Sequence, residues 1–439
     1  CLNNLKIILS ENKNILFSEK INLDPKFSYN KKVEINKLAK KSDYTLELLD
    51  SDHNMLISYS PAAKNLLKTP DPAEAAKKPA EIKTNEKLYL TAIHLEQYRH
   101  ATYDPDPYYL EGLKRDPNDI RINNAYGRLL LRRGLFSESE KHFRSAIERL
   151  TEKNPNPYDS EAYYNLGLSL KYQQKYQLSF EAFHKAIWSG DWHDSGYYEL
   201  AALSYKNEEI LNALEYIEKS IIKNYHNPKS RNLKTSLLRK LNRFTEAESF
   251  LKETIEIDKL DFAARSELYF INKRKGKIEA AEKSRDDIID ILRNDPHNFL
   301  ELAIDYGNTF FYQEAIDILE IYLSNNIKDE FNIYPMIYYY LAYYNLELAN
   351  QNEAKKYYEK AAAANSDYCF PNKLTSINVL KSAIKNNFQD EKAPYYLGNL
   401  YYDKKQYKKA IKLWEKSREI DNNNAVVHRN LALAYYNKM

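Results

Sequence analysis

The chain has few of the residues that build disulfide frameworks, metal centres or phosphate-binding loops. Its 439 residues include two cysteines, nine glycines and nine scattered histidines. The cysteines, Cys1 and Cys369, are too far apart in sequence to suggest a disulfide framework. Gly-rich phosphate loops and the His-Glu-x-x-His, Cys-x-x-Cys and Gly-x-Ser-x-Gly motifs are absent from the sequence. We therefore expect no cofactor and no metal. The sequence contains no catalytic motif that would decide whether the protein is an enzyme.

An excess of one charge and a long apolar run are also lacking. The formal net charge is +3, whereas a general nucleic-acid binder shows a concentrated basic excess. No apolar stretch approaches the roughly 18 residues that a membrane-spanning helix needs. The sequence therefore disfavours nucleic acid as a partner and predicts no membrane span.

What the chain does contain is a helical pattern in which small residues return at a fixed interval. Residues 163–186 read as two antiparallel helices around a polar break. Gly167, Ser179 and Ala186 allow the helices to approach closely, and Phe183 fills the space between them. Most steps between equivalent positions are 34 residues, and the longer steps are 39, 40 and 56. Those positions are Gly127, Gly167, Ala201, Thr235, Tyr269, Ala303, Ala342, Gly398 and Ala432.

This pattern resembles the tetratricopeptide-repeat family over about residues 86–439. The resemblance implies a mainly α fold, a right-handed solenoid of helical hairpins whose first helices line a concave surface. Leu88–Tyr98 and Tyr108–Lys114 are expected to form a capping hairpin, with Asn85 capping its first helix. The 56-residue step is explained by an inserted helix near residues 371–387.

The first 60 residues differ from the rest because they contain short β-prone runs separated by turn residues. We expect them to form the C-terminal strands of an incomplete, antiparallel, immunoglobulin-like β-sandwich. Residues 61–85, rich in Pro, Ala and Lys, read as a semi-rigid linker. The incomplete sandwich and the apolar 431–436 segment predict that both ends of the chain are truncated. The β-prone runs are Leu5–Leu9, Ile15–Phe17, Lys32–Ile35, Tyr44–Leu49 and Met55–Tyr59.

Three stretches of sequence resemble a family of large bacterial proteins with a domain of unknown function. They are Leu88–Tyr109, Asn154–Leu170 and Ala186–Ala201. In that family a β-sandwich part similar to carbohydrate-active enzymes precedes a tetratricopeptide tail. Cys1 has two readings, the lipid-modified start of a lipoprotein or the end of a fragment. The strand-like Leu5–Leu9 follows without a polar tether, which favours the fragment. The sequence does not decide the cellular compartment of the protein, although the cytoplasm is slightly favoured.

Two groups of residues are candidate binding sites. On the concave surface, tyrosines offer contact area at low entropy cost, although 39 tyrosines leave composition as an alternative explanation. Trp188 and Trp192 form either a platform for a sugar or peptide or a packing contact between repeats, with Asp194 or Ser195 capping the next helix. The concave candidates are Arg121, Asn124, Arg128, Tyr164, Lys171, Tyr198, Tyr205, Tyr339, Tyr343, Tyr395 and Asn399.

These observations favour a non-catalytic scaffold that binds a peptide or protein segment in its concave groove. The alternative is an accessory C-terminal part of a bacterial carbohydrate-active enzyme whose catalytic region lies upstream of residue 1. In that case the ligand would be a glycan.

Overall fold

The computed structural model describes residues 2–23, 29–35, 40–62, 75–98, 102–326 and 333–436. The chain divides into two compact units, of which one comprises residues 1–75 with 255–261 and the other 76–254 with 262–439. The strands belong to the first unit and nearly all of the helical sequence to the second. Cys1 and residues 63–74 of the predicted linker lie outside the described residues, and the predicted domain boundaries stay a prediction.

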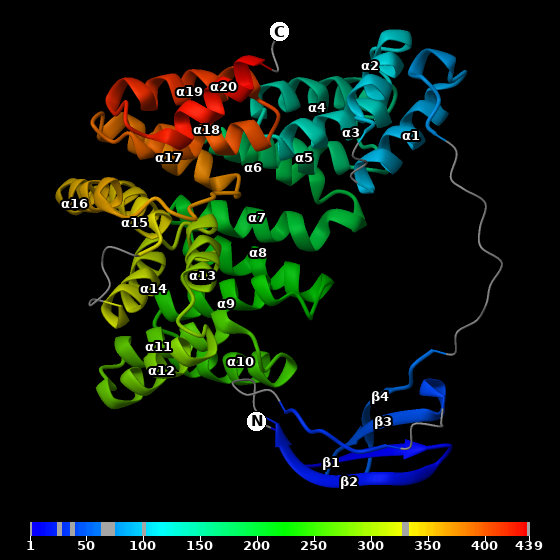
Figure 1. Ribbon diagram of the computed structural model, residues 1–439, viewed down its shortest axis with the longest axis vertical. Helices are drawn as coiled ribbons and strands as arrows, with labels where there is room; N and C mark the ends of the chain where they lie inside the picture. The colour runs from blue at the N-terminus through cyan, green and yellow to red at the C-terminus, as the bar shows by residue number, and fades with distance from the viewer. Residues whose placement is uncertain are drawn as a thin grey trace. The chain divides into compact units, whose positions relative to one another are not determined.

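Four strands form one antiparallel sheet in the order β2-β1-β3-β4 (Figure 1). The β1–β2 hairpin turns at Asn12 and Lys13, which both have positive φ, as a tight two-residue hairpin turn requires. The strand predicted at Lys32–Ile35 is wrong. Ile35 is 45% exposed, so this run has no buried face that would favour pairing. The strands are β1 (Leu2–Glu11), β2 (Asn14–Leu23), β3 (Tyr44–Leu49) and β4 (Met55–Tyr59).

The larger unit is a succession of antiparallel helical pairs, as the sequence period predicts (Figure 1). Its helices are α1 (Asn85–Gln97), α2 (Asp106–Arg115), α3 (Ile120–Arg132), α4 (Phe136–Thr151), α5 (Glu161–Tyr172), α6 (Tyr176–Ala186), α7 (His193–Lys206), α8 (Ile210–Lys223), α9 (Pro228–Lys240), α10 (Phe244–Ile257), α11 (Phe262–Arg274), α12 (Ile278–Ile291), α13 (Pro296–Asn308), α14 (Tyr312–Asn325), α15 (Pro335–Glu347), α16 (Gln351–Ala363), α17 (Thr375–Asn386), α18 (Lys392–Asp403), α19 (Tyr407–Ile420) and α20 (Ala425–Tyr436). Within the described ranges, none of these helices combines the length and apolar character needed to cross a bilayer.

In some pairs, close contact depends on a glycine of the first helix facing an aromatic ring of the second. A Cβ atom added at Gly167 would lie 2.6 Å from Cε1 of Phe183, whose side chain is fully buried. The same distance separates a Cβ at Gly127 from Cε1 of Phe143. The small residues of the repeat are therefore required by the approach of the two helices.

Three helix starts differ from the sequence prediction. The N-cap of α1 is Thr84, whose hydroxyl accepts from the Lys87 amide at 3.2 Å, because the Asn85 side chain instead donates to the Gly112 carbonyl. Helix α7 begins before Asp194, with Trp192 as its N-cap residue. The inserted helix α17 begins four residues after Pro371.

The array curls so that its last helical pairs contact its first. The Asn378 amide donates to the Tyr172 carbonyl at 3.2 Å, and the Gln406 amide donates to the Arg133 carbonyl at 2.6 Å. An ion pair joins Lys405 to Asp104. We call this contact zone the seam; it comprises the α3–α4 and α5–α6 turns on one side, and α17 and the α18–α19 turn on the other. The seam therefore brings α17 next to helices of the first repeats.

Candidate functional site

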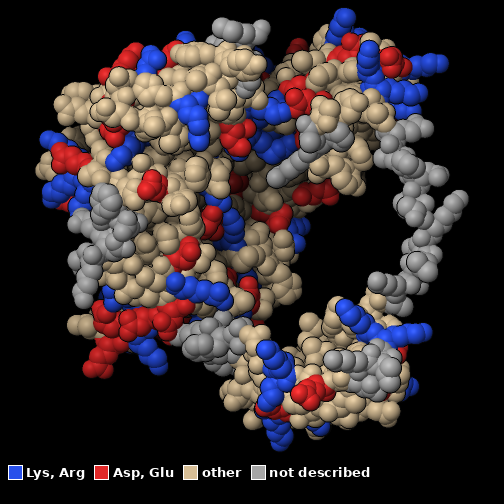
Figure 2. Space-filling model, viewed as in Figure 1, with Lys and Arg blue, Asp and Glu red and all other residues tan. Residues whose placement is uncertain are grey.

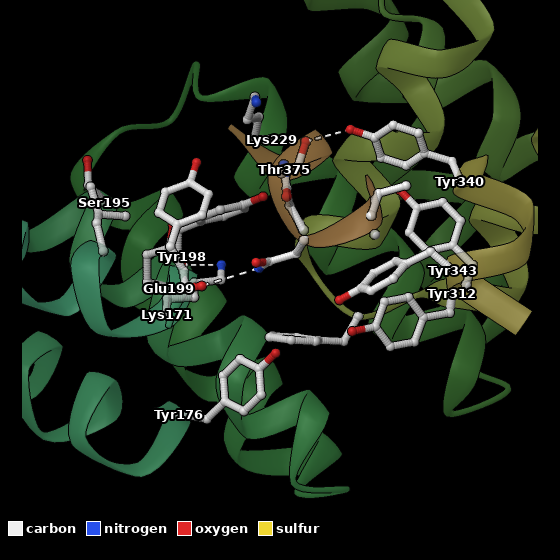
Figure 3. Close-up of a pocket in the computed structure, with 18 of the residues that line it drawn as sticks. Lys171, Tyr176, Ser195, Tyr198, Glu199, Lys229, Tyr312, Tyr340, Tyr343 and Thr375 are labelled. Atoms are coloured by element: carbon white, nitrogen blue, oxygen red, sulfur yellow. Dashed lines mark hydrogen bonds and ion pairs between the residues drawn. The ribbon is translucent and has the colours of Figure 1, made fainter. Parts of the chain in front are cut away.

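A cavity of 360 Å³ lies on the inner surface of the array. Its lining comes mainly from the first helices α5, α7, α13 and α15, from the starts of α6 and α14, and from α17. Figure 3 shows that tyrosine rings surround much of this space, and we call it the tyrosine cavity. Its tyrosines are Tyr164, Tyr172, Tyr176, Tyr198, Tyr312, Tyr340, Tyr343 and Tyr344.

The charged groups of the tyrosine cavity are balanced. Lys171 Nζ of α5 lies 2.6 Å from Glu199 Oε2 of α7, and the two side chains are only 17% and 10% exposed (Figure 3). Lys229 at the rim pairs with Asp305 at 2.8 Å. On the face drawn in Figure 2, acidic and basic side chains are likewise interspersed. The wall therefore favours hydrogen bonding and ring contact over attraction of one net charge.

The phenol groups are protonated at neutral pH. Burial raises the pKa of Tyr172 and Tyr176 to about 12, and the carboxylates of Glu199 and Glu347, respectively, also raise it. Burial likewise raises the pKa of Tyr340 to about 12, even though Ser376 and Thr375 lower it by hydrogen bonding. A protonated hydroxyl can both donate and accept hydrogen bonds. Those of Tyr340 and Tyr344 already bond within the protein, to Thr375 and Ser376 and to the Ala303 carbonyl.

Aromatic contacts hold the cavity wall in place. The Tyr164 ring stacks on Trp192 with centroids 4.6 Å apart. Tyr176 meets Phe310 edge to face at 5.4 Å, and the Lys206 ammonium lies 4.6 Å from the Tyr176 centroid. Such contacts contribute beyond the burial of area. These contacts orient Tyr164 and Tyr176 in the cavity wall.

Two family comparisons match parts of the chain. Residues 1–59 match the model of a YphG-like protein, second domain, and residues 398–438 match that of the TPR repeat. The helical array has the tetratricopeptide-repeat fold.

Three similar solved structures cover between 42% and 72% of this chain. YrrB, described as a TPR protein with an unusual peptide-binding site, is 20% identical over 42% of this chain and 91% of its own, with a TM-score of 0.36. PilF of Pseudomonas aeruginosa is 15% identical over 47% of this chain and 90% of its own, with a TM-score of 0.40. A tetratricopeptide repeat protein from Parabacteroides merdae is 15% identical over 72% of this chain and 98% of its own, with a TM-score of 0.35.

The tyrosine cavity brings together four of the residues predicted to lie on the concave surface. They are Tyr164, Lys171, Tyr198 and Tyr343, and all four line it. Trp192 supports the wall through its stacking on Tyr164. Tyr205 lies outside the lining and stacks on Phe311 at 3.9 Å between centroids. Their role in binding stays a prediction.

The three predicted residues of the first full repeat lie elsewhere in the tetratricopeptide array. Arg121 pairs with Glu86, and Arg128 Nη1 lies 2.7 Å from Glu161 Oε1. Asn124 is buried and accepts a hydrogen bond from the Asn165 amide. Each guanidinium group therefore already holds a carboxylate of the protein itself.

The remaining predicted residues lie in two further depressions. Tyr395 and Asn399 line a separate 360 Å³ cavity near α20, where Asn399 Oδ1 accepts a hydrogen bond from Trp414 Nε1 at 3.0 Å. Trp188 is 59% exposed, beside a 620 Å³ groove that α6 helps to line, with the Lys185 ammonium 4.2 Å from its ring centroid.

Sequence reasoning missed most of the tyrosine cavity and misplaced one of its neighbours. Phe310, Tyr312 and Thr375 were outside the repeat positions used to find the groove, because the curl of the array brings α14 and α17 to it. The tyrosine-rich run at 338–344 was the available signal. Tyr339 was expected in the groove but is fully buried, where its hydroxyl donates to Asp390 Oδ2 at 2.8 Å.

Proposed function

We propose that the protein is a non-catalytic scaffold that binds a peptide or a segment of another protein in the tyrosine cavity. The observation that carries this proposal is the cavity itself, 360 Å³ of space with eight tyrosines in its wall. Its size falls within the roughly 300–1,000 Å³ of ordinary ligand pockets.

The chemistry of the wall suits an extended peptide. Such a peptide presents backbone N–H and C=O groups alternately, and phenol hydroxyls can pair with either. Tyrosine rings add contact area while only two side-chain torsions have to be fixed. The Lys171–Glu199 pair adds one group of each sign, so the wall can contact a polar side chain without an unpaired charge.

A glycan is the second candidate ligand, and it would fit an accessory role beside a carbohydrate-active enzyme. The observation that favours it is the stacked pair of Tyr164 and Trp192, because aromatic faces also pack against sugar rings. Peptide is preferred because hydroxyl and amide groups are spread over several helices and match an extended chain.

Selection from a random peptide library displayed on phage, with a glycan array in parallel, tests the proposal on the full chain. We expect peptides to be enriched and Tyr176→Ala to weaken their binding about tenfold, the usual effect of removing an aromatic anchor. Tyr158→Ala is the matched control, since Tyr158 is 95% exposed and lies outside the cavity.

Three results would contradict the scaffold proposal. One is enrichment of glycans alone, which would favour the alternative. Another is the absence of any saturable ligand. The third is equal weakening by Tyr176→Ala and Tyr158→Ala, which would place the ligand elsewhere. Thermal unfolding of both variants shows whether each remains folded.

A further inference from the structure

A second cavity, of 310 Å³, lies within the seam. Its lining includes the α3–α4 turn and the start of α4, the α5–α6 turn, α17, α18 and α19. Tyr172 and Asn378 line both this seam cavity and the tyrosine cavity. The seam cavity exists only while the first and last helical pairs are in contact, because each side supplies part of its wall.

The seam cavity carries more positive than negative charge. Lys175, Lys381 and Lys409 line it, together with the single acid Glu138. Lys175 is neutralised by Glu140 at 2.8 Å. Within the described part of the chain, Lys381 and Lys409 have no carboxylate within ion-pair distance, and Lys409 Nζ lies 5.5 Å from the centroid of the Tyr401 ring. Both side chains are exposed, so solvent takes part in balancing these two ammonium groups.

The ammonium groups also oppose each other. Burial lowers the pKa of Lys381, and the positive charge of Lys409 lowers it further. A negative group bound between the two would remove this repulsion. The lining thus keeps an excess of positive charge, because Glu138 can offset only one of these two ammonium groups.

Backbone donors lie in the same wall. Helix α4 begins at Phe136, and its N-cap residue Leu135 offers no side-chain hydrogen bond. The first N–H groups of a helix have no partner within it and give its N-terminus a partial positive charge. Ser137 also belongs to the lining, where its hydroxyl donates to Gln173 Oε1 at 3.4 Å, and the Leu135 amide donates to the Leu130 carbonyl. The amides that follow Leu135 at the start of α4 are the donors that would complement the two lysines.

We propose that the seam cavity binds a phosphate-class oxyanion between Lys381 and Lys409, with additional hydrogen bonds from the start of α4. The bound anion would join the first helical pairs to the last and so hold the array closed. This proposal does not depend on whether a peptide binds in the tyrosine cavity.

Calorimetric titration of the full chain with inorganic pyrophosphate, in a chloride buffer, tests the proposal. We expect saturable 1:1 binding, and we expect the double variant Lys381→Ala/Lys409→Ala to lose at least tenfold in affinity. The matched control is Lys408→Ala/Lys412→Ala, which removes two exposed charges of α19 outside the cavity. It should retain the affinity of the wild type.

Hydrogen exchange supplies a second readout of the same binding. Pyrophosphate should slow amide exchange in α17 and in the α3–α4 turn of the wild type, and should leave the double variant unchanged. Titrations with inorganic phosphate and with a phosphoserine peptide distinguish a free anion from one carried by a chain, and tighter binding of either supports the site. Absence of saturable binding, or equal losses in the two double variants, would overturn the proposal.

Discussion

At the scale of single residues, glycines facing aromatic rings set the spacing of the helices. Gly167 illustrates the balance, because alanine would improve helix propensity by about 1 kcal/mol but would place its Cβ 2.6 Å from Phe183. Overpacking of this kind costs about 1–3 kcal/mol. We predict that Gly167→Ala lowers the melting temperature. Gly190→Ala is the control, since a Cβ there meets no atom within 4 Å, and an equal loss in both variants would contradict the prediction.

A buried charge network lies between α9, α11 and α14. Arg239 lies 2.8 Å from Glu267 and 2.9 Å from Glu314, and all three side chains are less than 10% exposed. Removing one partner of a buried pair leaves an uncompensated charge and costs about 3–5 kcal/mol. We predict that Arg239→Met markedly lowers the urea midpoint of unfolding.

The control for this change is Arg243→Met, because the pair of Arg243 with Glu246 is solvent-exposed and exposed pairs contribute little. A similar midpoint for Arg239→Met and the wild type would show that the network does not stabilise the fold.

The same network predicts a dependence of stability on pH. Burial raises the pKa of Glu314, but the charges of Arg239 and Lys240 outweigh it, and the net pKa lies below its ordinary value. A lowered pKa in the folded state contributes stability above the ordinary value of about 4.3, and this contribution is lost as pH falls below it. We predict that Glu314→Gln loses less melting temperature than the wild type between pH 5 and pH 3. Parallel curves of melting temperature against pH for the variant and the wild type would contradict this prediction.

At the scale of helices and strands, the sequence was most informative where a local rule sets the structure. The 34-residue step located the helical pairs, because most pairs repeat a small residue where the two helices approach. Helix starts were less accurate. Asn85 had the right chemistry for a cap, but neighbouring Thr84 formed the bond because Asn85 reaches the Gly112 carbonyl. Lys32–Ile35 alternated like a strand, yet pairing requires a partner and a buried face.

One helix cap can be tested directly. The Asp295 carboxylate accepts from the His297 and Asn298 amides at the start of α13, which supplies part of the tyrosine cavity. Loss of such a cap costs about 0.5–2 kcal/mol. We predict that Asp295→Ala lowers the melting temperature, whereas Lys277→Ala at the start of α12, where no side-chain cap exists, leaves it unchanged. A larger loss of melting temperature in Lys277→Ala than in Asp295→Ala would show that the cap is unimportant.

At the scale of the whole molecule, the closure of the array could not be predicted from the sequence. The contact of Arg133 with Gln406 joins residues 273 apart, and no local pattern encodes such a distance. The candidate site shares this property. Tyr164 and Tyr198 were found from the repeat, but Tyr312 and Thr375 reach the cavity only because the array curls.

Gly134 allows the closure to be tested. It has a φ of +71°, and an added Cβ would lie 2.6 Å from Ile377 Cδ1 across the seam. Gly276 has a φ of +68° but meets no atom within 4 Å. Alanine at either position carries the same left-handed penalty of about 1–2 kcal/mol. We predict faster amide exchange in α17 for Gly134→Ala than for Gly276→Ala, and equal rates would show that the seam tolerates the methyl group.

The Arg133–Gln406 hydrogen bond has a consequence for the number of repeats. A solenoid whose repeats contact only their neighbours can gain or lose a unit without disturbing distant ones. Here an added or deleted hairpin between α5 and α17 would carry Gln406 out of register with the Arg133 carbonyl. The contact between the first and last pairs therefore fixes the number of hairpins between them. The protein should tolerate single substitutions far better than the gain or loss of a repeat.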